Sequence, residues 1–142
     1  MTTLIAFLLF LIFLCISSIH FYWAAGGKWG SDAVLPTKAD NNIKVLNPGI
    51  VSTLIVAFGL LVFGFFILIV TKLVTFSIPQ WLTTYGLWII AGIFILRAIG
   101  DFNYVGFFKT IKHTKFGESD TKYFSPLCLV IGVLTIILAL TK

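Results

Sequence analysis

Four long apolar stretches dominate this sequence, at about residues 4–25, 49–70, 80–100 and 124–141. Each is close to the roughly 20 residues that a helix needs to cross the hydrocarbon core of a bilayer. Arg97 is the one basic side chain of consequence inside them. Because lipid offers no hydrogen bonds to exposed peptide groups, such stretches must pair their backbone within helices. The sequence therefore predicts an all-α fold, an integral membrane four-helix bundle.

The composition leaves little room for anything else. Hydrophobic residues make up 59% of 142 positions and charged residues 11%, whereas soluble domains average about 25% charged. We expect one membrane domain over residues 1–142, with a first loop at 26–48 and an amphipathic interfacial segment at 102–123. The net charge of +5 does not indicate a nucleic-acid partner, since nine of the ten basic residues flank the apolar stretches and suit lipid headgroups.

The positions of the cysteines and histidines argue against two kinds of redox site. Cys15 and Cys128 are not part of a C-x-x-C pair, which argues against a thiol-disulfide relay. Paired haem ligation within the bundle has no second histidine, because His113 lies in a loop. We predict no metal site, and the sequence identifies no cofactor, no catalytic residue and no reaction, so whether the protein is an enzyme stays open.

The distribution of basic residues predicts the orientation in the membrane. The loops after the first and third stretches carry seven lysines, and the opposite side carries Lys72 and Lys142. The positive-inside rule therefore places both long loops in the cytoplasm and both termini outside. A cleaved signal peptide is the alternative for the first stretch, but that stretch has no basic start and exceeds the usual length of about 7–15 apolar residues.

Polar side chains gather where the spans meet the long loops. On a helix that continues past Gly100, Arg97, Asp101 and Tyr104 stand at i, i+4 and i+7 and share one face. One interpretation is a structural Arg97–Asp101 ion pair. The other is a binding site for an anionic headgroup or substrate, because arginine binds carboxylate or phosphate through two parallel hydrogen bonds. His20 is expected near the same membrane surface.

The segment that follows mixes aromatic residues with Lys109, Lys112 and His113, a pattern typical of a segment in the headgroup plane with its lysines toward lipid phosphates. We expect Asp120 to cap a turn before the fourth span, with membership of the polar cluster as the alternative. The candidate ligand-binding residues are His20, Arg97, Asp101, Tyr104, Asp120 and Tyr123.

Prolines mark the expected helix starts. Asn47-Pro48 and Ser125-Pro126 both read as an N-cap followed by proline at the first helical position, and Pro79 is expected to start the third helix. Tyr22, Trp23 and Trp29 suggest an aromatic belt at the headgroup level.

Several motifs together resemble a family of small bacterial four-span membrane proteins of unknown function. They are His20-x-x-Trp23, Gly26-Gly27-x-Trp29-Gly30, Pro36, Arg97-x-x-Gly100-Asp101-x-x-Tyr104-x-Gly106-Phe107-x-Lys109 and Asp120-x-x-Tyr123-x-Ser125-Pro126-Leu127. The resemblance covers nearly the whole chain. It implies the fold and a location in the bacterial inner membrane, and it implies no activity.

A second, distant resemblance is to the MAPEG group of glutathione-dependent membrane enzymes. Arg97 followed by Tyr104-Val105-Gly106-Phe107 is similar to a stretch at the end of their third helix. Their second helix contributes charged residues to the thiol-cofactor site, whereas residues 49–70 here contain none.

These features leave four functional hypotheses. The first is a polar pocket at the cytoplasmic face that binds an amphipathic or anionic lipid-like ligand. The others are a MAPEG-like enzyme, a small transporter or channel subunit, and an assembly or regulatory partner of another membrane protein. The bilayer is the expected partner, and glycines within the spans permit close packing against the helices of a partner protein. A homo-oligomer is expected under the transporter hypothesis, since four-span proteins of this size often oligomerise to form a path.

Overall fold

The computed structural model describes residues 1–36, 38 and 48–142. Four helical segments within this part are long and apolar enough to cross a membrane. They are α1 (Thr2–Ala24), α3 (Ile50–Val70), α4 (Gln80–Ile99) and a continuous helix formed by α5 (Lys115–Ser119), η1 (Asp120–Phe124) and α6 (Ser125–Thr141). A short helix, α2 (Ser31–Val34), lies in the first long loop, and the described residues include no strand. The predicted all-α fold with four membrane-spanning helices is confirmed.

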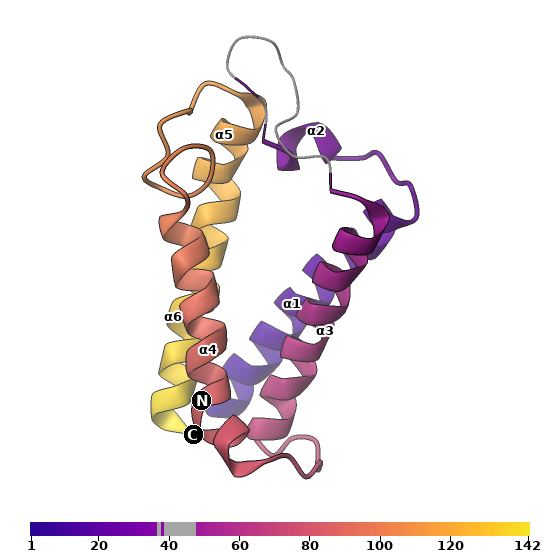
Figure 1. The fold of residues 1–142 in the computed structure, drawn as a ribbon. Helices are drawn as coiled ribbons and strands as arrows, with labels where there is room; N and C mark the ends of the chain where they lie inside the picture. The colour runs from indigo at the N-terminus through magenta and orange to yellow at the C-terminus, as the bar shows by residue number, and fades with distance from the viewer. Residues whose placement is uncertain (37, 39–47) are drawn as a thin grey trace.

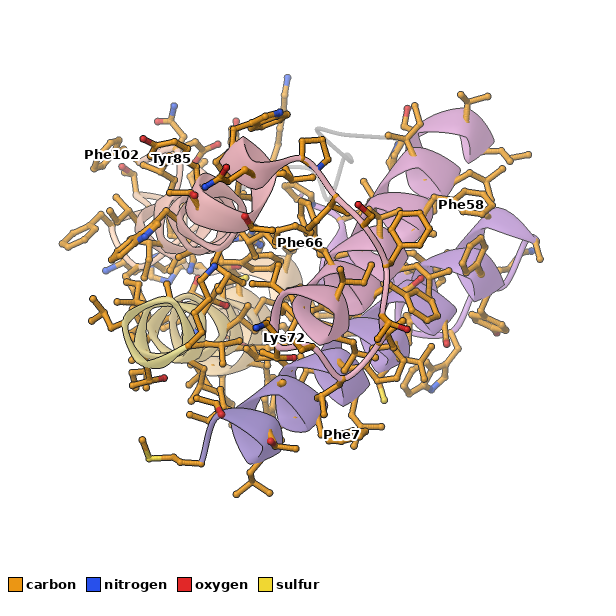
Figure 2. The ribbon with its side chains drawn as sticks, turned by 90° about the horizontal axis from the view of Figure 1, so that it is seen from below. Phe7, Phe58, Phe66, Lys72, Tyr85 and Phe102 are labelled. Atoms are coloured by element: carbon orange, nitrogen blue, oxygen red, sulfur yellow. The ribbon has the colours of Figure 1, made fainter. Side chains whose placement is uncertain are left out.

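The four long helices form two antiparallel hairpins, α1 with α3 and α4 with α6 (Figure 1). The hairpins converge at the end where both termini lie, and they diverge toward the two long connections. At that far end α2 contacts α5, so the connections of the two hairpins meet again. Figure 2 views the molecule from the terminal end, with side chains such as Phe7, Phe58 and Tyr85 directed outward, where lipid would surround them.

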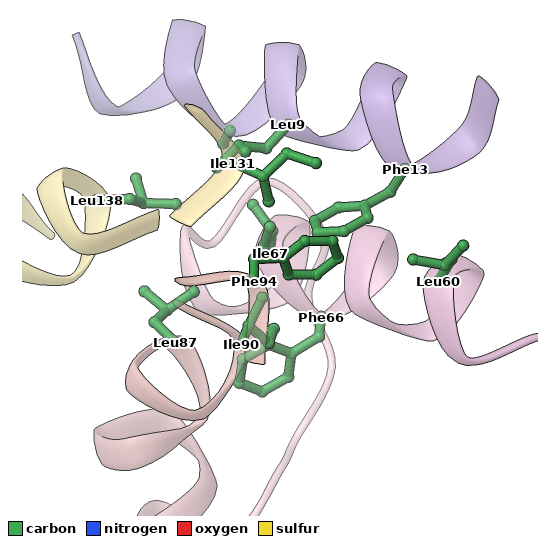
Figure 3. Packing of buried hydrophobic residues seen from close by; sticks show 11 residues of the cluster. Leu9, Phe13, Leu60, Phe66, Ile67, Leu87, Ile90, Phe94, Ile131 and Leu138 are labelled. Atoms are coloured by element: carbon green, nitrogen blue, oxygen red, sulfur yellow. The ribbon is translucent and has the colours of Figure 1, made fainter. Parts of the chain in front are cut away.

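The buried core lies where the hairpins converge. Leu9, Phe13, Ile67, Leu87 and Ile131 are fully buried there and come from all four long helices (Figure 3). The Phe13 and Phe94 rings meet edge to face at 5.4 Å between centroids, an arrangement that aromatic rings prefer. This packing joins the two hairpins at one end and leaves the other end free to hold polar groups.

The helix starts show how proline is accommodated. Pro79 directly precedes α4, and Gly49 directly precedes α3; Asn47 of the predicted cap lies outside the described residues. The fourth helix differs from expectation, since it begins at Lys115 and continues through Pro126 instead of starting near residue 124. Proline lacks an N–H and its ring crowds the preceding turn. The wider π-helical turn of η1 ends at Phe124, two residues before Pro126.

Candidate functional site

The end of α4 is fixed by two glycines. Gly100 has a φ of +88° and Gly106 a φ of +91°, the left-handed region that glycine adopts most readily. The chain reverses between them, and the N–H of Phe107 donates to the carbonyl of Ala98 at 2.9 Å. A Cβ at Gly100 would lie 1.7 Å from the carbonyl oxygen of Val105. The predicted continuation of the helix past Gly100 is therefore wrong, because the backbone doubles back on the last turn.

Asp101 serves as the cap of this reversal. Its Oδ1 accepts the N–H groups of Asn103, Tyr104 and Val105 at 3.0, 2.8 and 2.9 Å. Partial burial acts to raise the pKa of Asp101, but the backbone N–H groups of Val105, Tyr104 and Asn103 outweigh it and hold the pKa below its usual value. The turn-capping role expected for Asp120 thus belongs to Asp101.

The depressed pKa of Asp101 predicts acid sensitivity. A lowered folded-state pKa contributes stability that is present above the unfolded value of about 3.9 and is lost as the pH falls through the folded value. We expect the melting temperature of the wild type to fall below about pH 4, and the Asp101→Asn variant, which keeps an oxygen acceptor but does not titrate, to lose this part of the fall. Melting curves of both proteins in detergent from neutral to acidic pH test this, and parallel curves would contradict it.

Asp120 is the centre of the polar cluster at this end of the second hairpin. Its side chain is fully buried, and its Oδ1 accepts from Nη2 of Arg97 at 2.9 Å. Its Oδ2 accepts from the N–H of Gly106, from Nζ of Lys109 and from Oγ of Ser125, at 2.8, 2.9 and 3.0 Å. We call Arg97, Gly106, Lys109, Asp120 and Ser125 the Asp120 cluster. The expectation of a turn cap at Asp120 is wrong, and the alternative, membership of the cluster, is confirmed.

Lys109 faces inward. Its side chain is fully buried, and its Nζ contacts the carbonyl of Gly106, Oδ2 of Asp120 and Oγ1 of Thr121 at 3.0, 2.9 and 2.6 Å. The expectation that Lys109 points toward lipid phosphates is therefore wrong. A buried carboxylate without a counter-charge is energetically costly, and Lys109 supplies such a counter-charge to Asp120. Lys112, by contrast, is exposed.

Arg97 is the member of the cluster that has a hydrogen-bond donor without a partner among the described residues. It stands in the last turn of α4 and pairs with Asp120, replacing the predicted pair with Asp101. Its side chain is 34% exposed. Its second terminal nitrogen, Nη1, is buried and has no hydrogen-bond partner among the described residues. Such orphaned donors are uncommon in folded proteins and call for an explanation.

Gly106 lets its backbone reach the carboxylate. A Cβ at this position would lie 2.2 Å from the carbonyl oxygen of Ile99, so only glycine permits the close approach of the two backbone segments. The Gly106 N–H can then donate to Asp120. The contacts of Asp120 thus come from the end of α4, from the connection and from the start of α6.

The other predicted site residues have different surroundings. His20 lies in the first hairpin, with Nδ1 2.8 Å from the carbonyl of Ile16 and its ring against Trp23 at 5.1 Å. Tyr104 contributes its backbone N–H to the Asp101 cap. Tyr123 is 58% exposed, and Nζ of Lys122 lies 5.2 Å from its ring centre. Of the predicted residues, the cluster unites Arg97 and Asp120.

Three members of the cluster were not predicted. Lys109 was expected to face lipid phosphates, Gly106 belonged to a motif without an assigned role, and Ser125 was expected to start the fourth helix. Neither helical nor strand periodicity of the apolar residues indicates that Gly106, Lys109 and Ser125 come together around Asp120. Within the described part of the chain no group of three or more His, Cys, Asp or Glu side chains could hold a metal ion.

In chemical terms, the cluster consists of one carboxylate with two basic partners. Asp120 accepts four hydrogen bonds and Lys109 makes three, so both are fully occupied. Two basic side chains, Arg97 and Lys109, pair with one acidic side chain, so the cluster as a whole carries a net positive charge. Such an arrangement suits attraction of an anion.

Comparison with known proteins gives the family. The model of a family described as a protein of unknown function, DUF3995, matches residues 13–135. No curated protein and no solved structure gave a significant match. The similarity to the MAPEG group therefore stays a prediction from the sequence. The family match runs from residue 13, within α1, to residue 135, within α6, and includes the whole Asp120 cluster, so this chain belongs to the DUF3995 family.

Proposed function

We propose that this membrane protein binds an anionic amphiphile, through a phosphate or carboxylate headgroup, at Arg97. The observation that carries the proposal is the orphaned Nη1 of Arg97, a buried donor on a side chain that is one-third exposed. Nη2 is held by Asp120, which fixes the orientation of the guanidinium. An incoming oxyanion would accept from Nη1 while Nη2 keeps its hydrogen bond to Asp120.

The position of Arg97 favours a ligand that comes from the bilayer. The residue lies in the last turn of a membrane-crossing helix, where an amphiphile can place its headgroup while its tail stays in hydrocarbon. The excess positive charge of the Asp120 cluster favours an anionic headgroup over a zwitterionic one. We further propose that this face lies on the cytoplasmic side of a bacterial inner membrane, because the long loops carry most of the lysines.

Lipid retention by the purified protein tests the proposal. Native mass spectrometry of the detergent-solubilised full chain should show phosphatidylglycerol retained in preference to phosphatidylcholine. Arg97→Lys keeps a cation beside Asp120 but loses the planar pair of donors, so we expect its preference to fall about ten- to a hundredfold, the equivalent of one charge-assisted hydrogen bond. The melting temperature of the variant shows whether it stays folded.

A matched control separates the site from general surface charge. Lys112→Gln removes an exposed lysine from the same connection and should leave the preference unchanged. Equal losses in the two variants, or no preference in the wild type, would contradict the proposal. Glycerol 3-phosphate supplies the soluble arm: if it alone stabilises the wild type and not Arg97→Lys, the ligand is a free anion and not a lipid.

A further inference from the structure

Two phenylalanines in the connection between α4 and α5 form an exposed apolar patch. The side chains of Phe102 and Phe108 are 59% and 65% exposed, and their rings lie 6.4 Å apart with planes tilted by 39°. Figure 2 shows Phe102 on the same outer side of the molecule as Tyr85 of α4. The patch therefore lies on the flank of the second hairpin and is not buried among the helices.

The backbone holds Phe102 in place at a conformational cost. Its φ is +65°, a left-handed conformation that is unfavourable for a bulky side chain and that glycine would adopt freely. Its carbonyl oxygen accepts both the N–H and the Oγ1 hydroxyl of Thr110, at 3.0 and 2.9 Å. The preceding residue, Asp101, caps the turn. These hydrogen bonds hold the Phe102 ring at the surface, although a bulky side chain is unfavourable in this backbone conformation.

The surroundings of the patch indicate what covers it. Leu96 and Ile99, in the last turn of α4, are 69% and 36% exposed, so the lipid-facing flank of that helix continues into Phe102. Lys112 and Lys122 are exposed in the connection and in η1. Aromatic side chains next to lysines at the end of a span are typical of the membrane interface.

We propose that Phe102 and Phe108 insert into the interfacial layer of the bilayer beside α4, as a lipid-contact surface that sets the depth of the Asp120 cluster. The partner is the lipid leaflet at the long-loop end. This surface requires no ligand at Arg97, so the inference stands or falls separately from the proposed function.

Spin labels can measure the depth of the two side chains. In a Cys15→Ala, Cys128→Ala background, single cysteines at Phe102→Cys, Phe108→Cys and Asn103→Cys would be labelled in vesicles of phosphatidylcholine and phosphatidylglycerol. Asn103 is exposed in the same loop and serves as the control. Labels at 102 and 108 should be relaxed mainly by dissolved oxygen, and the label at 103 mainly by a water-soluble nickel complex. Equal access of the nickel complex to all three positions would overturn the proposal.

A second variant guards against disturbance by the label. Phe102→Gly removes the ring and relieves the left-handed strain, so the melting temperature in detergent should rise if the ring contacts only lipid. A fall in the melting temperature would mean that the ring packs within the protein, and would overturn the proposal.

Discussion

Replacing Asp120 with Ala should lower the free energy of unfolding by about 3–5 kcal/mol, the usual cost of leaving a buried charge without its partner. Asp120 is fully buried and accepts hydrogen bonds from Arg97, Gly106, Lys109 and Ser125. Lys109 is as deeply buried and would keep its charge with no counter-ion. Arg97 would suffer less, because its partly exposed side chain can reach the interface.

Reversible unfolding in detergent, followed by circular dichroism, would measure the loss. Glu118→Ala is the matched control, since this acid lies in α5 just before η1 and is exposed; its effect should stay within about 0.5 kcal/mol. The double variant Asp120→Ala, Lys109→Met removes both buried charges and should recover much of the stability. A single Asp120→Ala variant as stable as wild type would mean that the cluster contributes nothing to folding.

The second large effect is expected at Gly100. Ala at this position must adopt a φ of +88°, and its Cβ would collide with the Val105 carbonyl, 1.7 Å away. With a ψ of −169°, this conformation is essentially restricted to glycine and costs about 1–3 kcal/mol for other residues. Displacement of backbone adds to the cost, so we expect a loss of more than about 2 kcal/mol. The chain reversal would open and draw Gly106 away from Asp120.

Gly92→Ala is the control for this prediction. Gly92 lies in the same helix, and nothing lies within 4 Å of the Cβ that the substitution adds. Alanine should stabilise the helix there by about 0.5–1 kcal/mol. Thermal melts of the two variants should therefore move in opposite directions, and a Gly100→Ala protein that melts with the wild type would show that the reversal is not required.

The fold could be predicted because lipid imposes one solution on long uncharged stretches. Within the first and second spans the apolar residues surround the helix, and so the sequence carries no signal for which face meets which neighbour. The two hairpins converge near Phe13 and diverge beyond it. This arrangement depends on which helix faces contact each other, so it could not be predicted.

The candidate site was predicted in part. Arg97 stood out because a charge within a span is rare. Asp101 and Asp120 were given each other's roles, since nothing local distinguishes an acid that caps a turn from one that pairs with an arginine 23 positions away along the chain. Gly100 was the available signal that α4 ends. Lys109 was assigned to the surface because a segment read as amphipathic is assumed to expose its lysines.

The π-helical turn at Asp120–Phe124 sets the register of the fourth helix. One extra residue per turn rotates everything before it by about 100° relative to an uninterrupted α-helix. Asp120 can therefore face Lys109 while Ile131 and Leu138, further along the same helix, keep their faces toward the core. Deletion of a single residue from this turn would leave the apolar contacts of Ile131 and Leu138 in place but would rotate the Asp120 carboxylate away from Lys109. The π-helical turn thus allows the helix to orient its apolar residues and its buried acid independently.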